Sequence, residues 1–231
     1  MFDAVPVAYQ GVWLRTLLET PQGRDADSRV YWLQTGHWHA DLRVPAGRPD
    51  FTRIQSLDQC TAVHLQWLLR QEGFAGITQV EGELCEWHRR MDYRSDTFRD
   101  VGRMRFRECF LEELGVARQY REEWQQKPLA YRRFSAQCMP PDAPLQLLLC
   151  AGEFFMHVRS RNMRSDDARR LWARIDAHNL DDMRQLADFE ISFGKQHEGE
   201  MRILLSTLPW LEGVVLPHSE QWLNISGENN E

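Results

Sequence analysis

The chain has 231 residues, of which 42% are hydrophobic, 27% charged and 11% aromatic. This supplies enough apolar side chain for one sizeable core or two small ones, and nine Trp and eleven Phe exclude a disordered chain. The formal net charge of −6 leaves no basic excess, so the composition predicts no nucleic-acid partner.

The first predicted element is a long strand over residues 30–44. Its residues alternate with a period of two, and the central Gly36 predicts a bend or bulge. We expect the more apolar face to pack on the core. That face is formed by Trp32, Gln34, Gly36, Trp38, Ala40 and Leu42, and the opposite face by Tyr31, Leu33, Thr35, His37, His39, Asp41 and Arg43.

A helix is predicted after this strand. Ser56 with Gln59 three residues later is a capping-box pattern, and Gly73 is typical of a helix end. Apolar residues lie between them at roughly helical spacing: Leu57, Cys60, Val63, Trp67 and Leu68.

Two further strands are predicted by alternation, over residues 85–93 and 103–107. In the second strand, arginines occupy one face and apolar residues the other. The pattern leaves open which face of the first strand points inward. Its faces are Cys85, Trp87, Arg89, Met91 and Tyr93 against Glu86, His88, Arg90 and Asp92.

The same pattern recurs in the second half of the chain. Gly152, Phe154 and Arg159 stand 116 residues after Gly36, Trp38 and Arg43. The run 198–200 repeats the Glu-Gly-Glu of 81–83 at an offset of 117. Two matches in the same order with nearly the same spacing indicate an internal duplication.

The second half also predicts its own strand and helices. Cys150, Gly152, Phe154, Met156 and Val158 are expected on one apolar strand face. Ser165 is expected to begin a helix that buries Ala168, Leu171, Trp172 and Ile175, and Asn179 to break it before a short piece around Met183 and Leu186. The segment Pro140–Pro144 is predicted to be a loop, and we place two β-rich modules at 1–125 and 126–231.

Several runs of the first module together resemble a family of tandem lipocalin-like (calycin) proteins of bacteria and fungi that has no settled activity. The resemblance implies a mainly β fold of two related β-barrel modules, each with a helix between strands, the second diverged and packed on the first. It brings no catalytic residues. It is carried by Gly11-Val12-Trp13, Val30–Thr35, Ala40–Pro45, Arg48-Pro49, Gln71–Gly76 with Thr78, Cys85-x-Trp87-His88-Arg89 with Asp92-Tyr93, and Asp100-x-Gly-x-Met-x-Phe106.

No targeting or membrane segment is predicted. The first ten residues lack a basic region and a long apolar run, and the apolar stretch 145–156 is interrupted by Glu153 and too short to cross a bilayer. The five cysteines form no C-x-x-C and are expected to be free thiols in a reducing compartment. We therefore expect a cytoplasmic protein without membrane contact.

His37-Trp38-His39 is the sharpest local motif. Residues two apart on a strand point the same way, so His37 and His39 could share a metal ion with His88 or Asp41 as third ligand. The alternative is a solvated strand face that the two histidines only decorate. Asp41 and Arg43 would form either a structural ion pair or a pair that orients a ligand, and we favour the structural role.

A ligand cavity is the second candidate site. We expect it to be lined by Trp38, Arg43, Trp87, Arg89 and Tyr93, with Glu86 or His88 serving as acid or base in an enzyme. The same aromatic residues would equally suit an ordinary core.

Three functions follow from these patterns. The first is binding of a small, mostly apolar ligand in a barrel cavity. The second is an isomerase, cyclase or dehydratase that uses the same cavity. The third is a non-catalytic interaction protein whose barrels are filled by side chains. The sequence names no cofactor, and homodimer formation stays open.

Overall fold

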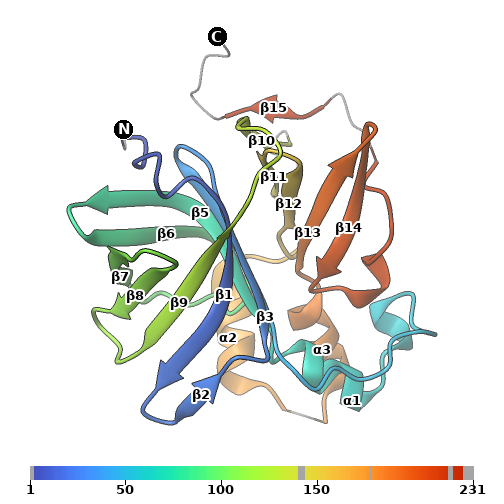
Figure 1. Ribbon diagram of the computed structural model, residues 1–231. Coiled ribbons are helices and arrows are strands. Elements are labelled where there is room, and N and C mark those ends of the chain that lie inside the picture. The colour runs from blue at the N-terminus through green and yellow to red at the C-terminus, as the bar shows by residue number, and fades with distance from the viewer. Residues whose placement is uncertain (1–2, 140–143, 177, 218–220, 226–231) are drawn as a thin grey trace.

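The fold is described from a computed structural model, which places residues 3–139, 144–176, 178–217 and 221–225 (Figure 1). The described chain is mainly β and forms two antiparallel sheets with short helices between them. None of the described helices has the length and apolar character needed to span a membrane.

The first sheet closes into a barrel. Each strand pairs with its neighbours in an antiparallel meander, and β9 pairs back onto β1, so eight strands form the wall while β2 extends one end of β1. The mainly β prediction and a barrel in the first module are confirmed. The strands are β1 Gly11–Thr20, β2 Gly23–Asp25, β3 Arg29–Gln34, β4 Trp38–Val44, β5 Glu72–Glu81, β6 Leu84–Asp92, β7 Asp100–Phe106, β8 Leu111–Gly115 and β9 Arg121–Lys127.

The second sheet stays open. Its order is β14-β13-β12-β11-β10-β15, and in the described part of the chain its two edges do not pair with each other. The expectation of a second closed barrel is therefore not met. The strands are β10 Phe134–Cys138, β11 Gln146–Ala151, β12 Phe154–Arg159, β13 Glu190–His197, β14 Glu200–Ser206 and β15 Leu223–Asn224.

The first helix begins later than its sequence predicts. A short 3-10 turn, η1 (Leu57–Gln59), follows Ser56, whose side chain makes no capping bond, and Cys60 then returns to extended backbone. Helix α1 (Ala62–Leu68) starts after Thr61, which exchanges capping hydrogen bonds with His64. A capping box is therefore present, but it is formed by Thr61 and His64 and not by Ser56 and Gln59. Thr61 and His64 lie at the start of the continuous helix.

The helices of the second half agree better with prediction. Helix α2 (Ser165–Arg174) buries Ala168 and Leu171, and α3 (Leu180–Ala187) begins after Asn179. The side chain of Asn179 accepts from the Asp182 N–H at 3.1 Å, which is the reason the chain restarts a helix there. A last short turn, η2, spans Pro209–Leu211.

A central stretch of each half has the same order of elements, although the first half adds strands on both sides of it. A hairpin (β3–β4), a helix (α1) and a hairpin (β5–β6) follow one another in the barrel; β11–β12, α2–α3 and β13–β14 do so in the open sheet. Of the loop predicted at Pro140–Pro144, residues 140–143 lie outside the described part of the chain.

Residues 30–44 form a hairpin and not one long strand. The turn lies at 35–37, where the Trp38 N–H donates to the Thr35 hydroxyl at 3.1 Å. Gln34 pairs with His39 across the turn, so the two faces differ from those expected. Trp32, Gln34, His39 and Asp41 share the barrel interior, whereas Leu33, Ala40 and Leu42 face outward into the main core.

The second half repeats this correction. Gly152, with φ +56°, lies in the turn between β11 and β12. Cys150 pairs with Phe155, whereas Phe154, Met156 and Val158 point to the opposite face. In both hairpins the alternation of apolar residues runs on through the turn in the sequence. In the structure the turn exchanges the two faces, so residues that the pattern places on one face lie on opposite faces of the sheet.

A β-bulge reverses the faces of β6. Ala75 pairs with Met91 and Gly76 with Arg89, so Arg90 is the additional residue. Cys85 and Trp87 face the barrel interior, whereas Met91 and Tyr93 face the main core. The residues from Cys85 to Tyr93 expected on one strand face therefore lie on two faces, because Arg90 is inserted between them.

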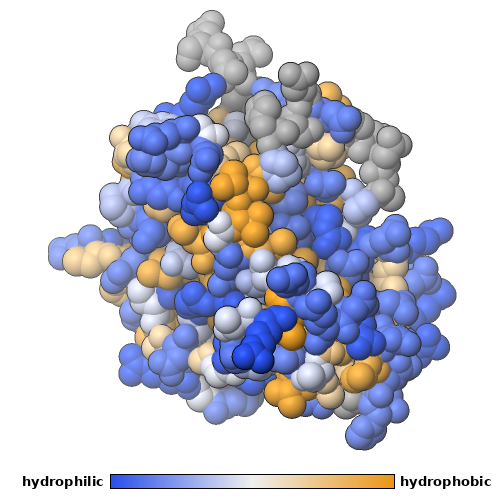
Figure 2. Space-filling view, turned by 90° about the vertical axis from the view of Figure 1, so that its right-hand side faces the viewer, coloured by the Kyte–Doolittle hydropathy of each residue, from blue (hydrophilic) through white to orange (hydrophobic). Residues whose placement is uncertain are grey.

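The main hydrophobic core lies between the two sheets. The ring of Phe193 from the open sheet stacks on Tyr31 of the barrel, with ring centres 4.2 Å apart, and on Phe154, with ring centres 5.6 Å apart. The outer face of the open sheet carries a smaller cluster built around Leu148, Phe155 and Ile203. The side of the molecule on which β14 lies is mostly hydrophilic with a compact apolar patch (Figure 2). The open sheet thus buries apolar side chains on both faces.

All five cysteines are free. Cys60 and Cys85 are buried, and burial raises the pKa of the Cys60 thiol to about 11.

Candidate ligand site at the barrel mouth

One end of the barrel holds a cavity of about 600 Å³. Its rim is formed by the β1–β2 turn, the 94–98 segment after β6 and the β8–β9 turn. The opposite end is closed by the segment that precedes β1, where Tyr9 is buried and its carbonyl accepts from Trp13 Nε1–H at 2.7 Å. The barrel is therefore open to a ligand at one end only.

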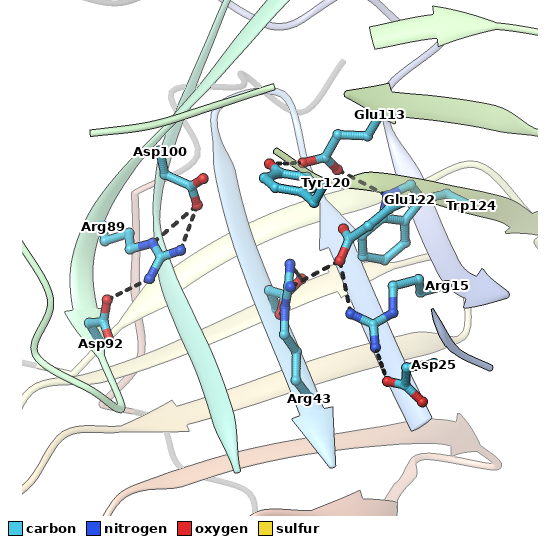
Figure 3. Close-up of polar contacts among 11 residues, drawn as sticks. Arg15, Asp25, Arg43, Arg89, Asp92, Asp100, Glu113, Tyr120, Glu122 and Trp124 are labelled. Carbon is cyan, nitrogen blue, oxygen red and sulfur yellow. Dashed lines mark hydrogen bonds and ion pairs between the residues drawn. The ribbon is translucent and has the colours of Figure 1, made fainter. Parts of the chain in front are cut away.

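A ladder of buried and partly buried ion pairs runs along the floor of the cavity (Figure 3). Arg15 donates to Glu122 at 2.8 Å and to Asp25 at 2.7 Å. Arg43 donates to the same Glu122 oxygen at 3.2 Å and to Asp41 at 2.7 Å. The ladder joins β1, β4 and β9, which are distant in sequence, because the barrel closes β9 onto β1.

The two members of the Asp41–Arg43 pair respond differently to burial. Burial alone would lower the pKa of the Arg43 guanidinium, but Asp41 and Glu122 raise it well above its usual value. Burial raises the pKa of Asp41 even though Arg43 opposes the shift. The predicted Asp41–Arg43 pair is thus present, and it holds Arg43 at the cavity wall.

A second carboxyl group, Glu113, lies directly opposite Glu122 on the neighbouring strand β8. The Tyr120 hydroxyl donates to one oxygen of Glu113 at 2.6 Å, and Trp124 Nε1–H donates to the other at 3.0 Å. Burial and the negative charge of Glu122 raise the pKa of Glu113 to about 8. The direction of this shift favours the protonated form of Glu113, as expected for a buried carboxyl beside a second carboxyl.

The third polar group of the cavity is Arg89. It donates to Asp92 at 2.8 Å and to Asp100 at 2.6 Å (Figure 3). Its guanidinium lies 3.7 Å from the centre of the Phe74 ring and 4.7 Å from that of Phe98. Arg118 lies over Phe98 at 3.7 Å, so this ring is held between two guanidinium groups at the rim.

Below the cavity the barrel is packed by aromatic rings. Trp32 contacts Trp87 and Trp124 edge-on, with ring centres 5.8 Å apart in both pairs. The remaining void at this depth is about 10 Å³, room for about one water molecule. Side chains thus fill the closed half of the barrel and leave the mouth hollow.

The structure brings only some of the predicted ligand-binding residues together. Arg43 and Arg89 line the cavity, and Trp87 lies just beneath it. Trp38 lies outside the barrel against the main core, because the 35–37 turn exchanges the faces. Tyr93 also lies outside, where its hydroxyl donates to the Leu68 carbonyl at 2.9 Å, because the bulge at Arg90 reverses β6.

Glu86 and His88, the predicted acid–base pair, lie on the outer side of β6. They line a surface groove of about 600 Å³ beside Arg169 of α2. Glu86 accepts two hydrogen bonds from Arg99 at 2.8 and 2.6 Å, and His88 Nδ1 lies 3.8 Å from Glu86. The two residues are neighbours, but neither faces the barrel cavity.

The predicted metal pair does not share a strand face. His37 lies in the 35–37 turn, whereas His39 is buried in the barrel with Nδ1 3.0 Å from the Thr78 hydroxyl. Burial and the nearby Arg89 lower the pKa of His39 well below its usual value. Within the described residues, no three His, Cys, Asp or Glu side chains lie together in a way that could hold a metal ion.

Sequence reasoning missed most of the cavity's charged residues. The missed residues are Arg15, Asp100, Glu113, Tyr120 and Glu122. A signal was available on β9, where Glu122 precedes the buried Trp124 by two residues. Residues two apart in a strand share a face, so this spacing places Glu122 inside with the Trp.

The fold and the site define a class, an antiparallel eight-stranded barrel that fits a lipocalin-like (calycin) fold. No family profile and no curated protein matches the chain. Among solved structures, the chain is similar to the uncharacterized protein YLR301w from Saccharomyces cerevisiae. The TM-score is 0.57 at 13% identity, over 93% of this chain and 97% of that one. At this identity, the likeness concerns the fold alone.

Proposed function

We propose that the protein binds a small organic molecule in the mouth of its barrel. The observation that carries the proposal is the hollow of about 600 Å³, which a barrel filled by its own side chains would not leave. Its size lies in the range of small-molecule sites, and it combines aromatic walls with a few fixed polar groups.

The polar groups change the kind of ligand expected. A mostly apolar ligand would leave the buried charges of the floor without contacts. The cavity instead suits a molecule with an apolar or aromatic body, which Phe74, Phe98 and Tyr120 would contact, and at least one polar group directed toward the floor.

Native mass spectrometry of the freshly purified protein tests the proposal, followed by a ligand-observed NMR screen of small aromatic compounds. We expect saturable binding that weakens in Phe98→Ala, because this variant removes a rim aromatic without opening the barrel core. Phe106→Ala is the matched control, since Phe106 is 47% exposed and borders a different hollow at the closed end. A bare chain mass together with no saturable binding from the whole screen would contradict the proposal.

A second candidate is an acid–base enzyme that uses the same cavity. It is favoured by one observation: Tyr120 lines the cavity and its hydroxyl donates at 2.6 Å to Glu113, a carboxyl whose pKa burial and Glu122 raise. A proton held at such a pKa suits a general acid. Turnover of a bound ligand that is lost in both Glu113→Gln and Tyr120→Phe, with binding retained, would support this candidate.

We also propose that the chain belongs to the tandem lipocalin-like family and that its halves, 1–125 and 126–231, arose by duplication. The equal order of elements and the offset of 116 residues between Gly36 and Gly152 support this. Expression of 1–125 alone tests the division, since a self-contained module would fold without the second sheet.

A further inference from the structure

We propose that the ligand of the barrel mouth carries a protonated amine, which would bind Glu122 on the cavity floor. This inference rests on the proposed function and names the chemical class of its ligand. It is drawn from one unsatisfied atom, the pairing of the surrounding charges and the aromatic walls.

The unsatisfied atom is Glu122 Oε2. Glu122 is only 1% exposed and borders the cavity, and its other oxygen accepts from both Arg15 and Arg43. Among the residues that the structure describes, no donor reaches Oε2. It lies on the side of the carboxylate toward Tyr120 (Figure 3). A buried carboxylate oxygen without a donor costs free energy, so the site is complete only when a donor reaches it.

In the described part of the chain, the floor offers no cation without a carboxylate partner. Arg15 and Arg43 share three carboxylates, Asp25, Glu122 and Asp41. The ladder therefore holds one more negative than positive group. A cationic donor would restore the balance, whereas an anion would add to the excess.

The third guanidinium near the floor is also occupied. Arg89 is bound by both Asp92 and Asp100, which again outnumber it. An anionic ligand would have to displace one of these carboxylates to reach Arg89. The charge pattern of the cavity thus selects against anions as well as for a cation.

The rim of the cavity carries arginines that no described carboxylate neutralises, so an anionic ligand would bind there and not on the floor. In the described residues, Arg94 and Arg118 contact aromatic rings, Trp172 at 4.5 Å and Phe98 at 3.7 Å, and neither has a carboxylate within salt-bridge distance. A carboxylate ligand would be held there, at the surface. An amine would pass Phe98 and reach the floor. Amines and carboxylates are therefore expected to bind at different depths in the cavity.

The walls fit a flat apolar body behind the amine. Phe74 is 4% exposed at the cavity wall, and Tyr120 stands beside Glu122 with its hydroxyl bound to Glu113. An aromatic amine would therefore place its ring against these side chains and its nitrogen at Glu122 Oε2. Such a charge-assisted hydrogen bond is stronger than one between neutral groups.

Three probes with the same ring test the inference: benzylamine, benzyl alcohol and phenylacetate. Their dissociation constants are measured by amide NMR titration near neutral pH and low salt. We expect benzylamine to bind about tenfold more tightly than phenylacetate, with the alcohol between them, and nuclear Overhauser contacts from its methylene to Tyr120.

The key variant is Glu122→Gln, which keeps the shape but removes the charge. We expect it to reduce the preference for benzylamine to about threefold or less. Glu123→Gln is the matched control, because Glu123 is the next residue on β9, pairs with Arg121 and is absent from the cavity. The contacts to Tyr120 are measured on the unaltered protein, so they test the inference even where Glu122→Gln does not fold.

The outcomes separate the two proposals. If none of the probes binds at about 10 mM and the wider screen finds no ligand, the proposed function itself fails. If the probes bind but phenylacetate binds as tightly as benzylamine, or Glu122→Gln keeps the full preference, the amine inference is overturned and the binding function stands. Contacts from benzylamine to rim protons alone, with none to Tyr120, would also overturn it.

Discussion

The closed barrel and the open sheet both contain a hairpin, a helical segment and a second hairpin in this order, but only the barrel encloses an interior. In the barrel, the last strand returns to the first, so one face of every strand is enclosed and carries a ladder of buried charges below a hollow mouth. The open sheet has no interior of this kind, and it buries apolar side chains on both faces. Closure, more than the local pattern of the strands, therefore decides where a ligand site can form.

One pair of positions shows the difference directly. Asp41 and Arg43 on β4 correspond, at the offset of 116, to His157 and Arg159 on β12. In the barrel, Arg43 borders the cavity. In the open sheet, His157 and Arg159 both approach Glu190, at 2.9 and 3.6 Å, in a compact network. Equivalent strand positions thus line a cavity in the barrel (Arg43) and form a packed polar network in the open sheet (Arg159).

The largest expected effect comes from removing Glu122. We expect Glu122→Ala to lower the free energy of unfolding by about 3–5 kcal/mol, because two buried guanidinium groups lose a partner. Glu190→Ala in the open sheet is expected to cost about 1.5–3 kcal/mol, since Arg159 keeps Asp188 at 2.8 Å. Urea unfolding measures both, with Glu123→Ala as the control, because Glu123 is partly exposed and pairs with Arg121 outside the ladder. Equal losses for Glu122→Ala and the control would contradict the role given to the ladder.

The next effect tests whether the two sheets unfold as one unit. Phe193→Ala removes the ring that stacks on Tyr31 of the barrel, and it is expected to cost about 3–5 kcal/mol. Because the main core is shared, we expect one cooperative transition, followed by amide exchange measured separately for strands of the barrel and strands of the open sheet. Two separate transitions in the unaltered protein would show that the sheets are independent.

In the barrel, Glu113 is expected to contribute stability that falls as the pH rises. Because burial and Glu122 raise the pKa of Glu113 to about 8, the folded protein binds a proton that the unfolded chain, near 4.5, has released. Stability is then highest below the unfolded pKa and falls as the pH rises toward about 8, by a few kcal/mol at about 1.4 kcal/mol per pKa unit. In Glu113→Gln this fall should disappear above the range in which Asp41 titrates. An unchanged pH profile would exclude the proposed protonation of Glu113.

The smallest expected effect compares two bulges. Register shifts occur at Ala75/Gly76 in the barrel and at Phe193/Gly194 in the open sheet. A Cβ at Gly76 would lie 2.0 Å from the His88 carbonyl oxygen, and one at Gly194 would lie 2.3 Å from the Phe155 ring and 2.4 Å from the Arg202 carbonyl oxygen. We expect Gly76→Ala and Gly194→Ala each to cost about 1–3 kcal/mol. Thermal melts measure both, with Gly82→Ala as the comparison that carries backbone strain alone, because its φ is +58° and a Cβ there would meet nothing within 4 Å.

The sequence by itself determined the features that depend on neighbouring residues. Alternation predicted the strand at 103–107, where Met104 is buried and Arg103 and Arg105 are exposed. Asn179 predicted the break before the last helix, because its side chain bonds within one turn. Such features rest on contacts between residues close in sequence, and a local pattern can carry them.

Only the tertiary structure decided which residues meet in the cavity. The turn at 35–37 and the extra residue Arg90 each exchange strand faces, so Trp38 and Tyr93 leave the barrel while His39 enters it. Arg15 and Glu122 lie 107 residues apart and meet because β9 pairs with β1. Strand alternation has a period of two, so one inserted residue reverses every later position, and long-range pairing leaves no trace in a local pattern.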